Sequence, residues 1–376
     1  MAKKKILYIH CGGETVGGIE TYLAHVVKAH KNCDAYLGIV KAGEYSRYLK
    51  WQKTPNVILL NGGRLREIAK VGIAVRTATR FVRNNNIEFV IGKGNNSWVY
   101  AAIIARLARI RSIFYVANDI NPQYWKSPIT LLAGCMKPWL YVANSEFTAK
   151  SIAEVLGQES SIVYPAANVD KFVGIDNKNA RESLCKEFAI SPQKFIYTIV
   201  GRLQEWKGQH IAIEAFKKMR NKKNAVLLVV GDYTHANDQP FFRRLQQLAA
   251  AESVIFTGFR KDIPQIITAS DVVVHASITP EPFGITVVEG MLAKKSVIAS
   301  QAGGPLEIID HGENGLLVPV KDVCKLSQTM DMLFENRDLG FTLGEKAYEK
   351  AKCEFSVEAS ARLMEKAIRA HDGAVR

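Results

Sequence analysis

Two glutamates eight positions apart bracket a Phe-Gly turn in the segment 281–289, EPFGITVVE. The β-branched run before it, residues 271–277, predicts a buried parallel strand, and Gly284 then opens a helix. Glu281 therefore follows the carboxyl end of a strand, where open α/β sheets bind ligands, whereas Glu289 lies within the helix. Carboxylates at these two places could hold hydroxyl groups.

Backbone amides at the start of this helix add a site for phosphate. Those of Gly284, Ile285 and Thr286 lack acceptors within the helix and lie at its positive end. Carboxylates for hydroxyls and amides for phosphate together suit a nucleotide-sugar. The spacing alone is equally compatible with a solvated loop glutamate and a surface glutamate on the helix.

A pair of cations favours the first interpretation. Residues 195–203, FIYTIVGRL, predict a strand that ends at Gly201, with Arg202 directly after it and Lys207 just before a helix at 209–220. An arginine and a lysine five residues apart can bind a diphosphate, the first through a planar fork and the second as a point charge. Such loop cations are usually just solvated. Here both motifs follow strands of one predicted sheet, so we expect them to meet at the same edge.

Six motifs, taken in order, resemble those of the family 4 retaining glycosyltransferases, the group 1 glycosyltransferases. They are GGIE at 17–20, PAANVDKF at 165–172, VGRLQEWKG at 200–208, TGF at 257–259, EPFGITVVE at 281–289 and AGGPLE at 302–307. The resemblance runs nearly end to end. It implies an α/β fold of two facing Rossmann-like domains with a deep interdomain cleft, the glycosyltransferase B architecture.

The resemblance also implies an activity and a set of residues. A hexose would pass from a nucleoside diphosphate sugar to a hydroxyl acceptor with its anomeric configuration retained and without a metal or other cofactor. Arg202, Lys207 and Glu281 would be catalytic, because the two cations stabilise the leaving diphosphate and Glu281 holds sugar hydroxyls. Glu289 would bind the ribose. The other donor-binding residues that the family's motifs indicate are Gly17, Gly18, Phe259, Arg260, Phe283, Gly284, Ile285 and Thr286.

The acceptor side departs from the family pattern. Many relatives carry a histidine at the end of the strand 112–117, whereas this chain has Asn118 followed by Asp119. Asparagine can hydrogen-bond a sugar hydroxyl but cannot carry a proton at neutral pH. Either Asp119 takes part in acceptor binding, or the leaving phosphate removes the acceptor's proton, or Asn-Asp is only a strand terminus.

Two other site classes are disfavoured. The glycine loop 12–18, GGETVGG, lacks the G-x-G-x-x-G spacing, and no acidic residue ends the second strand, so a nicotinamide site is not expected. The histidines show no ligand spacing, and the chain lacks an Asp-x-Asp triplet, so we expect no metal site and a structural role for each of the following: His10, His25, His210, His275 and His311.

Length and composition indicate two globular domains. The chain has 376 residues, of which 48% are hydrophobic and 23% charged, as in soluble proteins. We expect an acceptor-binding domain at 1–172, a nucleotide-sugar-binding domain at 173–355 and a helix at 356–376 that packs back on the first domain. Six cysteines without a Cys-x-x-Cys pair suit buried thiols in a reducing cytoplasm. The apolar start at 6–9 is too short for a signal peptide, and no stretch is long enough to span a bilayer.

The net charge of +14 is concentrated in the first half of the chain. Residues 1–172 contain 23 Lys and Arg against 11 Asp and Glu. The stretch 65–83 predicts an amphipathic helix with one basic arc and one apolar arc. The basic arc comprises Arg66, Lys70, Arg76, Arg80 and Arg83, and the apolar arc Ile68, Val71, Val75, Ala78 and Val82. The basic arc could face anionic lipid headgroups or a diphosphate-linked lipid acceptor, or it could simply be solvated.

Three functions remain open. The first is a transferase in polysaccharide, lipopolysaccharide or glycolipid synthesis, cytoplasmic and peripheral on the inner face of the membrane, with a glycan or lipid-linked sugar as acceptor. The second is a small-metabolite transferase of the sucrose type, or a nucleotide-sugar epimerase of the same fold. The third, a nucleic-acid-binding protein, is disfavoured because no aromatic residues are interleaved with the basic ones.

Overall fold

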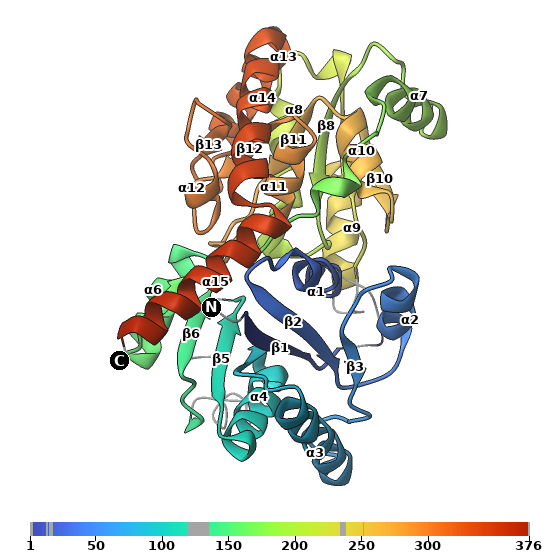
Figure 1. Cartoon of the computed structure of the whole chain (residues 1–376). Helices are drawn as coiled ribbons and strands as arrows, with labels where there is room; N and C mark the ends of the chain where they lie inside the picture. Colours follow the sequence, from blue (N-terminus) through green and yellow to red (C-terminus); the bar gives the residue numbers. More distant parts are fainter. Residues whose placement is uncertain are drawn as a thin grey trace. The chain divides into compact units, whose positions relative to one another are not determined.

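The computed structural model describes residues 3–12, 14, 18–118, 120, 135–233, 238–250 and 252–374. The chain forms two compact units, unit 1 from Met1–Asn168 with Ser356–Arg376 and unit 2 from Val169–Phe355. Each unit is a parallel sheet with helices on both faces (Figure 1). The predicted fold class, an α/β protein with two Rossmann-like domains, is confirmed.

Unit 1 contains a seven-stranded sheet in the order β3-β2-β1-β4-β5-β6-β7. Its strands are β1 (Lys4–His10), β2 (Cys33–Ile39), β3 (Val57–Leu59), β4 (Phe89–Lys93), β5 (Arg111–Val116), β6 (Leu140–Ala143) and β7 (Ser160–Ile162). Its helices include α1 (Gly18–Ala29), α2 (Glu44–Trp51), α3 (Ile68–Asn84), α4 (Asn95–Ala108), α6 (Glu146–Leu156) and α15 (Val357–Ala374). The strand order reverses between β1 and β4, which makes their carboxyl ends the topological switch point of this sheet.

Alternating side chains of the strands pack on the two layers of helices. Ile6 and Tyr8 of β1 face α1 and α15, whereas Leu7 and Ile9 face α3 and α4. Helix α3 begins at Ile68 rather than at residue 65. Ile68 is 81% exposed, so its predicted place on the apolar arc is wrong, because the first residue of a helix has no preceding turn that could turn it toward the core.

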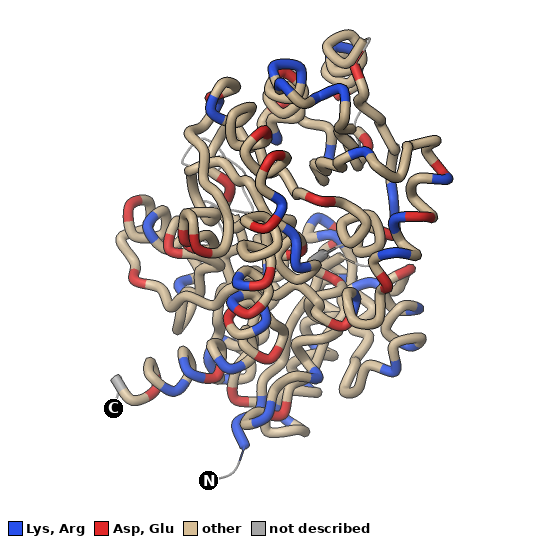
Figure 2. Tube along the Cα trace, turned by 90° about the horizontal axis from the view of Figure 1, so that it is seen from above, with Lys and Arg blue, Asp and Glu red and all other residues tan. Residues whose placement is uncertain are grey.

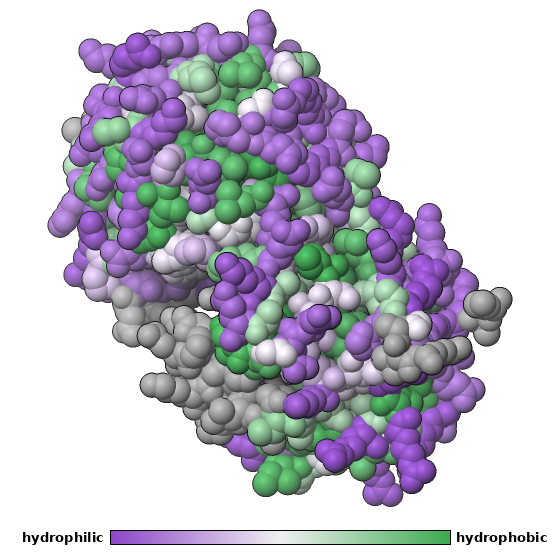
Figure 3. Space-filling view, turned by 90° about the vertical axis from the view of Figure 1, so that its left-hand side faces the viewer, coloured by the Kyte–Doolittle hydropathy of each residue, from purple (hydrophilic) through white to green (hydrophobic). Residues whose placement is uncertain are grey.

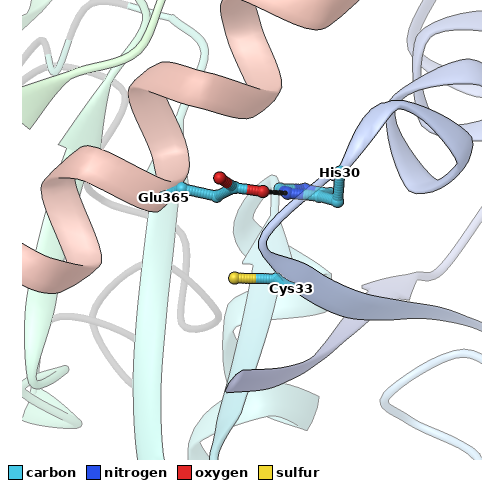
Figure 4. A group of neighbouring side chains, drawn as sticks. All are labelled: His30, Cys33 and Glu365. Atoms are coloured by element: carbon cyan, nitrogen blue, oxygen red, sulfur yellow. Dashed lines mark hydrogen bonds and ion pairs between the residues drawn. The ribbon is translucent and has the colours of Figure 1, made fainter. Parts of the chain in front are cut away.

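Helix α15 is fixed to unit 1 by polar contacts along its length. The hydroxyls of Tyr22 and Ser360 lie 3.0 Å apart, and Asp372 pairs with Lys4 and Arg111. Glu365 projects from α15 toward β2 and meets the ring of His30, with Cys33 close by (Figure 4). Acidic and basic positions follow one another along this helix (Figure 2). The segment after unit 2 therefore completes the core of unit 1.

Unit 2 contains a six-stranded sheet in the order β10-β9-β8-β11-β12-β13. Its strands are β8 (Phe195–Val200), β9 (Ala225–Val230), β10 (Val254–Gly258), β11 (Val272–His275), β12 (Ser296–Ser300) and β13 (Leu316–Val318). Its helices include α7 (Asn177–Glu187), α8 (Gln209–Lys218), α9 (Gln239–Leu248), α10 (Ile263–Ala269), α11 (Ile285–Leu292), α12 (Pro305–Ile308), α13 (Val323–Glu335) and α14 (Arg337–Glu354). Here the strand order reverses between β8 and β11.

The described surface is mixed in character. On the face drawn in Figure 3, apolar side chains form islands among hydrophilic ones. Among the described residues, none of the helices combines the length and the apolar character needed to cross a bilayer.

Candidate active site

The switch point of unit 2 brings two loops together. One loop follows β8 and carries Lys207 on a short 3-10 helix, Glu205–Lys207, while the other follows β11 and carries Glu281. Because β8 and β11 are parallel neighbours, their carboxyl ends share one edge of the sheet. The backbone joins the loops directly, since the amide of Ile278 donates to the carbonyl of Trp206 at 2.8 Å.

Glu281 is the centre of a dense polar cluster. Its Oε1 lies 2.7 Å from Lys207 Nζ, and its Oε2 lies 2.5 Å from His275 Nε2 and accepts from the Ser277 hydroxyl at 3.0 Å. The residue is only 9% exposed. Burial alone would raise the pKa of this carboxyl, but the hydrogen bonds and charges of His275 and Lys207 outweigh that effect and hold the pKa well below its usual range. Glu281 is therefore a carboxylate in a fixed orientation.

Glycines of the segment 302–307 hold the loop of Glu281. Gly303 has a φ of +66°, and a Cβ there would lie 2.3 Å from the carbonyl oxygen of Glu281. The amide of Gly304 donates to that same oxygen at 2.8 Å. The Gly-Gly pair thus permits a backbone approach that any larger residue would prevent.

Another glycine fixes the lysine. Gly208 has a φ of +70°, and a Cβ on it would lie 1.8 Å from the carbonyl oxygen of Ala276. This close approach presses the turn after Lys207 against the end of β11, and Lys207 Nζ also lies 4.2 Å from the centroid of the Trp206 ring. Arg202 is different, because its side chain is exposed and forms no ion pair with a described residue.

Helix α11 supplies the third component. Gly284 caps it with a φ of +107°, and the amides of Ile285 and Thr286 lie in its first turn, where the helix offers no acceptors. Phe283 is buried against Phe355, with 5.7 Å between ring centroids. Further along the helix, burial raises the pKa of Glu289 to about 7, and Lys171 opposes this shift only in part. Glu289 forms no hydrogen bond with described side chains, so burial dominates the environment of its carboxyl group.

The remaining predicted site residues are placed in several ways. Phe259 is 69% exposed at the end of β10. Arg260 pairs with Glu187 and with Asp262, which raises the pKa of its guanidinium, so contact with a base would require these pairs to open. In unit 1, Gly18 is the first residue of α1 and Asn118 is exposed after β5. Gly17 and Asp119 lie outside the described residues.

Sequence reasoning missed two members of the cluster. His275 was expected to be structural and Ser277 was not considered, yet both contact Glu281. The only signal was a histidine and a serine at the end of an otherwise apolar strand, six and four residues before the glutamate. His275 Nδ1 is buried without a hydrogen-bond partner in the described part of the chain, so Nε2 makes the polar contacts of this ring, with Glu281 and Ser277.

One group of described residues has the chemistry of a metal site. His30, Cys33 and Glu365 in unit 1 place their ligand atoms within 4.8 Å of one another (Figure 4). Both oxygens of Glu365 already accept hydrogen bonds, one from His30 and the backbone of Asn32 and the other from the Asn32 side chain. The second ring nitrogen of His30 lies 2.9 Å from the hydroxyl of Tyr8. These contacts are sufficient to explain the cluster as the anchor of α15.

Comparison with known proteins agrees with this geometry. Residues 180–350 match the family described as "Glycosyl transferases group 1". This match assigns most of unit 2 to the group 1 glycosyltransferases. The resemblance inferred from the six motifs is thereby confirmed.

The relatives with similar sequences align with different fractions of this chain. The trehalose synthase of Thermococcus litoralis is 28% identical over 253 residues, which cover 64% of this chain and 59% of that protein. The chain therefore spans well under two thirds of that relative's length. An uncharacterised glycosyltransferase of Methanocaldococcus jannaschii is 24% identical over 92% of this chain and 93% of its own.

A solved structure covers almost the whole glycosyltransferase. The Anabaena protein HepE, in complex with UDP, is 25% identical with a TM-score of 0.82 and covers 97% of this chain and 100% of that one. The same Anabaena protein has also been solved with UDP-glucose.

Proposed function

We propose that this group 1 glycosyltransferase moves a hexose from a nucleoside diphosphate sugar to a hydroxyl acceptor and retains the anomeric configuration. The observation that carries the proposal is the position of Glu281 at the switch point of unit 2. It is held as a carboxylate between Lys207 and His275, beside the first turn of α11. Carboxylate oxygens that can accept hydrogen bonds from sugar hydroxyls thus lie together with a cation and the amides of the first helical turn. They lie at a sheet edge of the kind that binds nucleotides.

Each group has a role in bond cleavage. The bond between the anomeric carbon and the β-phosphate oxygen breaks, and its electron pair stays on the phosphate. Lys207, the exposed Arg202 and the amides of Ile285 and Thr286 stabilise that charge, because they are in place before it forms. The acceptor oxygen bonds to the anomeric carbon, and its proton passes to the leaving phosphate. Glu281 holds sugar hydroxyls and Glu289 holds those of the ribose.

A uridine nucleotide is the first donor to test. The Anabaena protein with the matching fold has been solved with UDP and with UDP-glucose. Because the match with the Anabaena protein extends over nearly the whole of both chains, it supports the same donor class for this protein. We assign the contact with the base to Phe259, whose side chain is exposed after the end of β10.

For the acceptor, we propose a sugar of a polysaccharide, lipopolysaccharide or glycolipid, used on the cytoplasmic face of the membrane. The support is helix α3, on which Arg76, Arg80 and the apolar residues Ile68 and Ile73 are all exposed. Arginines for anionic headgroups and isoleucines for acyl chains are the composition of an interfacial helix. A small-metabolite acceptor is the second candidate, because the trehalose synthase of Thermococcus litoralis is a relative.

A panel of UDP-, GDP- and ADP-sugars tests the donor proposal. We expect one nucleotide class to raise the melting temperature and its sugar to be hydrolysed slowly without acceptor, with both effects lost in Glu281→Ala. Failure of every nucleotide-sugar to bind would reject the proposal.

Co-sedimentation with anionic vesicles, compared with duplex DNA at the same salt concentration, tests the surface of α3. Loss of vesicle binding in Ile68→Asn with Ile73→Asn is expected, and preference for DNA would contradict the membrane assignment.

A further inference from the structure

The switch point of unit 1 ends in two ionisable residues. Strands β1 and β4 flank the reversal of strand order, and their last residues are His10 and Lys93. The register pairs Ile9 with Gly92, so the next residue of each strand lies beside the other on the same face of the sheet. In unit 2 the corresponding edge carries the candidate donor site. Open α/β sheets bind ligands at this position, so the polar groups here require an explanation.

Lys93 is buried, and no oxygen atom of the described residues forms a hydrogen bond with it. It is 7% exposed, and its Nζ lies 3.6 Å from the centroid of the Tyr22 ring and 4.5 Å from that of Tyr115. The hydroxyls of these tyrosines are used elsewhere, at Ser360 and at the carbonyl of Val163. They offer Lys93 only their ring faces. Within the described residues Lys93 forms no hydrogen bond or ion pair, and burial lowers its pKa to about 7.

The nearby acid does not neutralise this lysine. The Oε1 atom of Glu20 lies 2.9 Å from His10 Nε2, and burial lowers the pKa of Lys93 more than the charge of Glu20 raises it. Two more buried atoms at this edge lack a partner among the described residues, His10 Nδ1 and the hydroxyl of Tyr45. The rings of His10 and Tyr45 pack edge to face with 5.4 Å between centroids. Three polar groups around the ends of two adjacent strands thus have no hydrogen-bond partner within the part of the chain that the structure describes.

A purely structural role does not account for Lys93. A methionine would fill the same space between two aromatic rings, make favourable sulfur contacts and avoid the desolvation of an amine. A lysine kept there against that cost is characteristic of a functional site. The tyrosine rings attract the ammonium but carry no net charge, and no carboxylate of the described residues forms an ion pair with it.

We propose that the carboxyl ends of β1 and β4 bind an anionic group of the acceptor, a phosphate or a carboxylate, through the ammonium of Lys93. The inference rests on the proposed transferase function and specifies the class of acceptor, a hydroxyl compound that carries an acidic group. His10 Nδ1 and the Tyr45 hydroxyl hydrogen-bond hydroxyls of the same acceptor. Glu20 stays paired with His10 and keeps that ring in place.

Competitive labelling of the wild-type protein tests the site directly. Trace acetic anhydride is added at about pH 7, close to the pKa of Lys93, and acetylation of each lysine is measured by mass spectrometry. Glucose 6-phosphate, glucuronate and glucose serve as the phosphate, carboxylate and neutral probes. We expect one of the two acids to reduce Lys93 acetylation roughly tenfold at about ten times its dissociation constant, and glucose to have no such effect. Protection by both acids assigns a general anion site, and protection by one identifies the group.

Three results would overturn the proposal: no labelling of Lys93 under any condition, equal protection by glucose, or no protection by either acid. A matched control is Lys295 of unit 2, whose burial also lowers its pKa, to about 8. Its labelling should not respond to the acids.

Variants separate this site from the donor site. Lys93→Met should weaken binding of the protecting acid by roughly 10- to 100-fold in calorimetry, the effect of losing one charged hydrogen bond. Lys295→Met should leave it unchanged, and UDP binding should be retained in both, which also shows that the variants fold. If a folded Lys93→Met protein binds the protecting acid as tightly as the wild type does, the proposed anion site is rejected. The donor proposal is not affected by that result. Absence of nucleotide-sugar binding in the wild type would reject the donor proposal, while the labelling still reports on Lys93.

Discussion

The ion pair between Lys207 and Glu281 gives a quantitative test of the candidate site. Lys207→Met removes the cation from Oε1 of a carboxylate that is largely buried. Breaking a buried ion pair by deleting one partner destabilises a protein by about 3–5 kcal/mol. His275 and Ser277 still hold Oε2, so we expect about 2–3 kcal/mol here, because a remaining hydrogen bond to a charged group contributes about 1.5–3 kcal/mol.

Calorimetry of the ligand-free protein measures this cost. For a domain of this size, 1 kcal/mol corresponds to about 2–4 °C in melting temperature, so the transition of unit 2 should fall by about 4–12 °C. Adding Glu281→Gln to the lysine variant removes the unpaired charge and should restore about half of the loss. The double-mutant cycle should therefore give a coupling of about 1–2 kcal/mol.

An exposed pair provides the control. Lys294 contacts Glu345 at 2.8 Å in the same unit, almost the same distance as in the site, but both side chains are solvent-accessible. Lys294→Met should cost less than about 1 kcal/mol, because water screens such pairs. If Lys207→Met is no more harmful than Lys294→Met, or if its effect simply adds to that of Glu281→Gln, then burial does not strengthen the pair and the reasoning fails.

Three further outcomes are expected. His275→Leu should lower kcat roughly 10- to 100-fold with little change in UDP affinity, since it removes one hydrogen bond to a charged group, and His275→Gln should recover part of the rate; equal losses in both variants would exclude a positioning role. The pKa of Glu289, about 7 in the folded protein against 4.5 ordinarily, means that folding retains a proton which the unfolded chain loses, so wild-type stability falls as pH rises from 4.5 to 7. Glu289→Gln should therefore be more stable than wild type by about 1–3 kcal/mol at about pH 8 and no different at about pH 4, and a constant difference in urea unfolding across pH would be inconsistent with this. Gly303→Ala should destabilise unit 2 by more than Gly312→Ala, since both have positive φ but only Gly303 would place its Cβ 2.3 Å from another atom; equal melting temperatures would show that the loop of Glu281 can move.

Much of the fold could be predicted from local patterns. Apolar runs of β-branched residues alternate with helical periodicity through both halves, and that alternation permits only parallel sheets with crossover helices. Parallel strands place all their carboxyl ends at one edge, so Lys207 and Glu281 could be assigned to the same edge although they are 74 residues apart.

Side-chain direction and distant partners could not be predicted in this way. His275 reads as the last residue of a buried strand, and only the return of the loop shows that its ring meets Glu281. Arg260 finds Glu187 across 73 residues, a pairing that no local spacing encodes. Lys93 reads as an ordinary strand terminus, because its burial depends on tyrosines from α1 and β5.

The return of α15 to unit 1 has a consequence for synthesis. Unit 1 is interrupted between Asn168 and Ser356, and all of unit 2 lies in the interruption. On the ribosome, the apolar face around Tyr22 and His30 emerges long before the helix that covers it, whereas unit 2 is made without a break. The nested unit can therefore reach its native state while the apolar face that α15 covers is still exposed on the nascent outer unit.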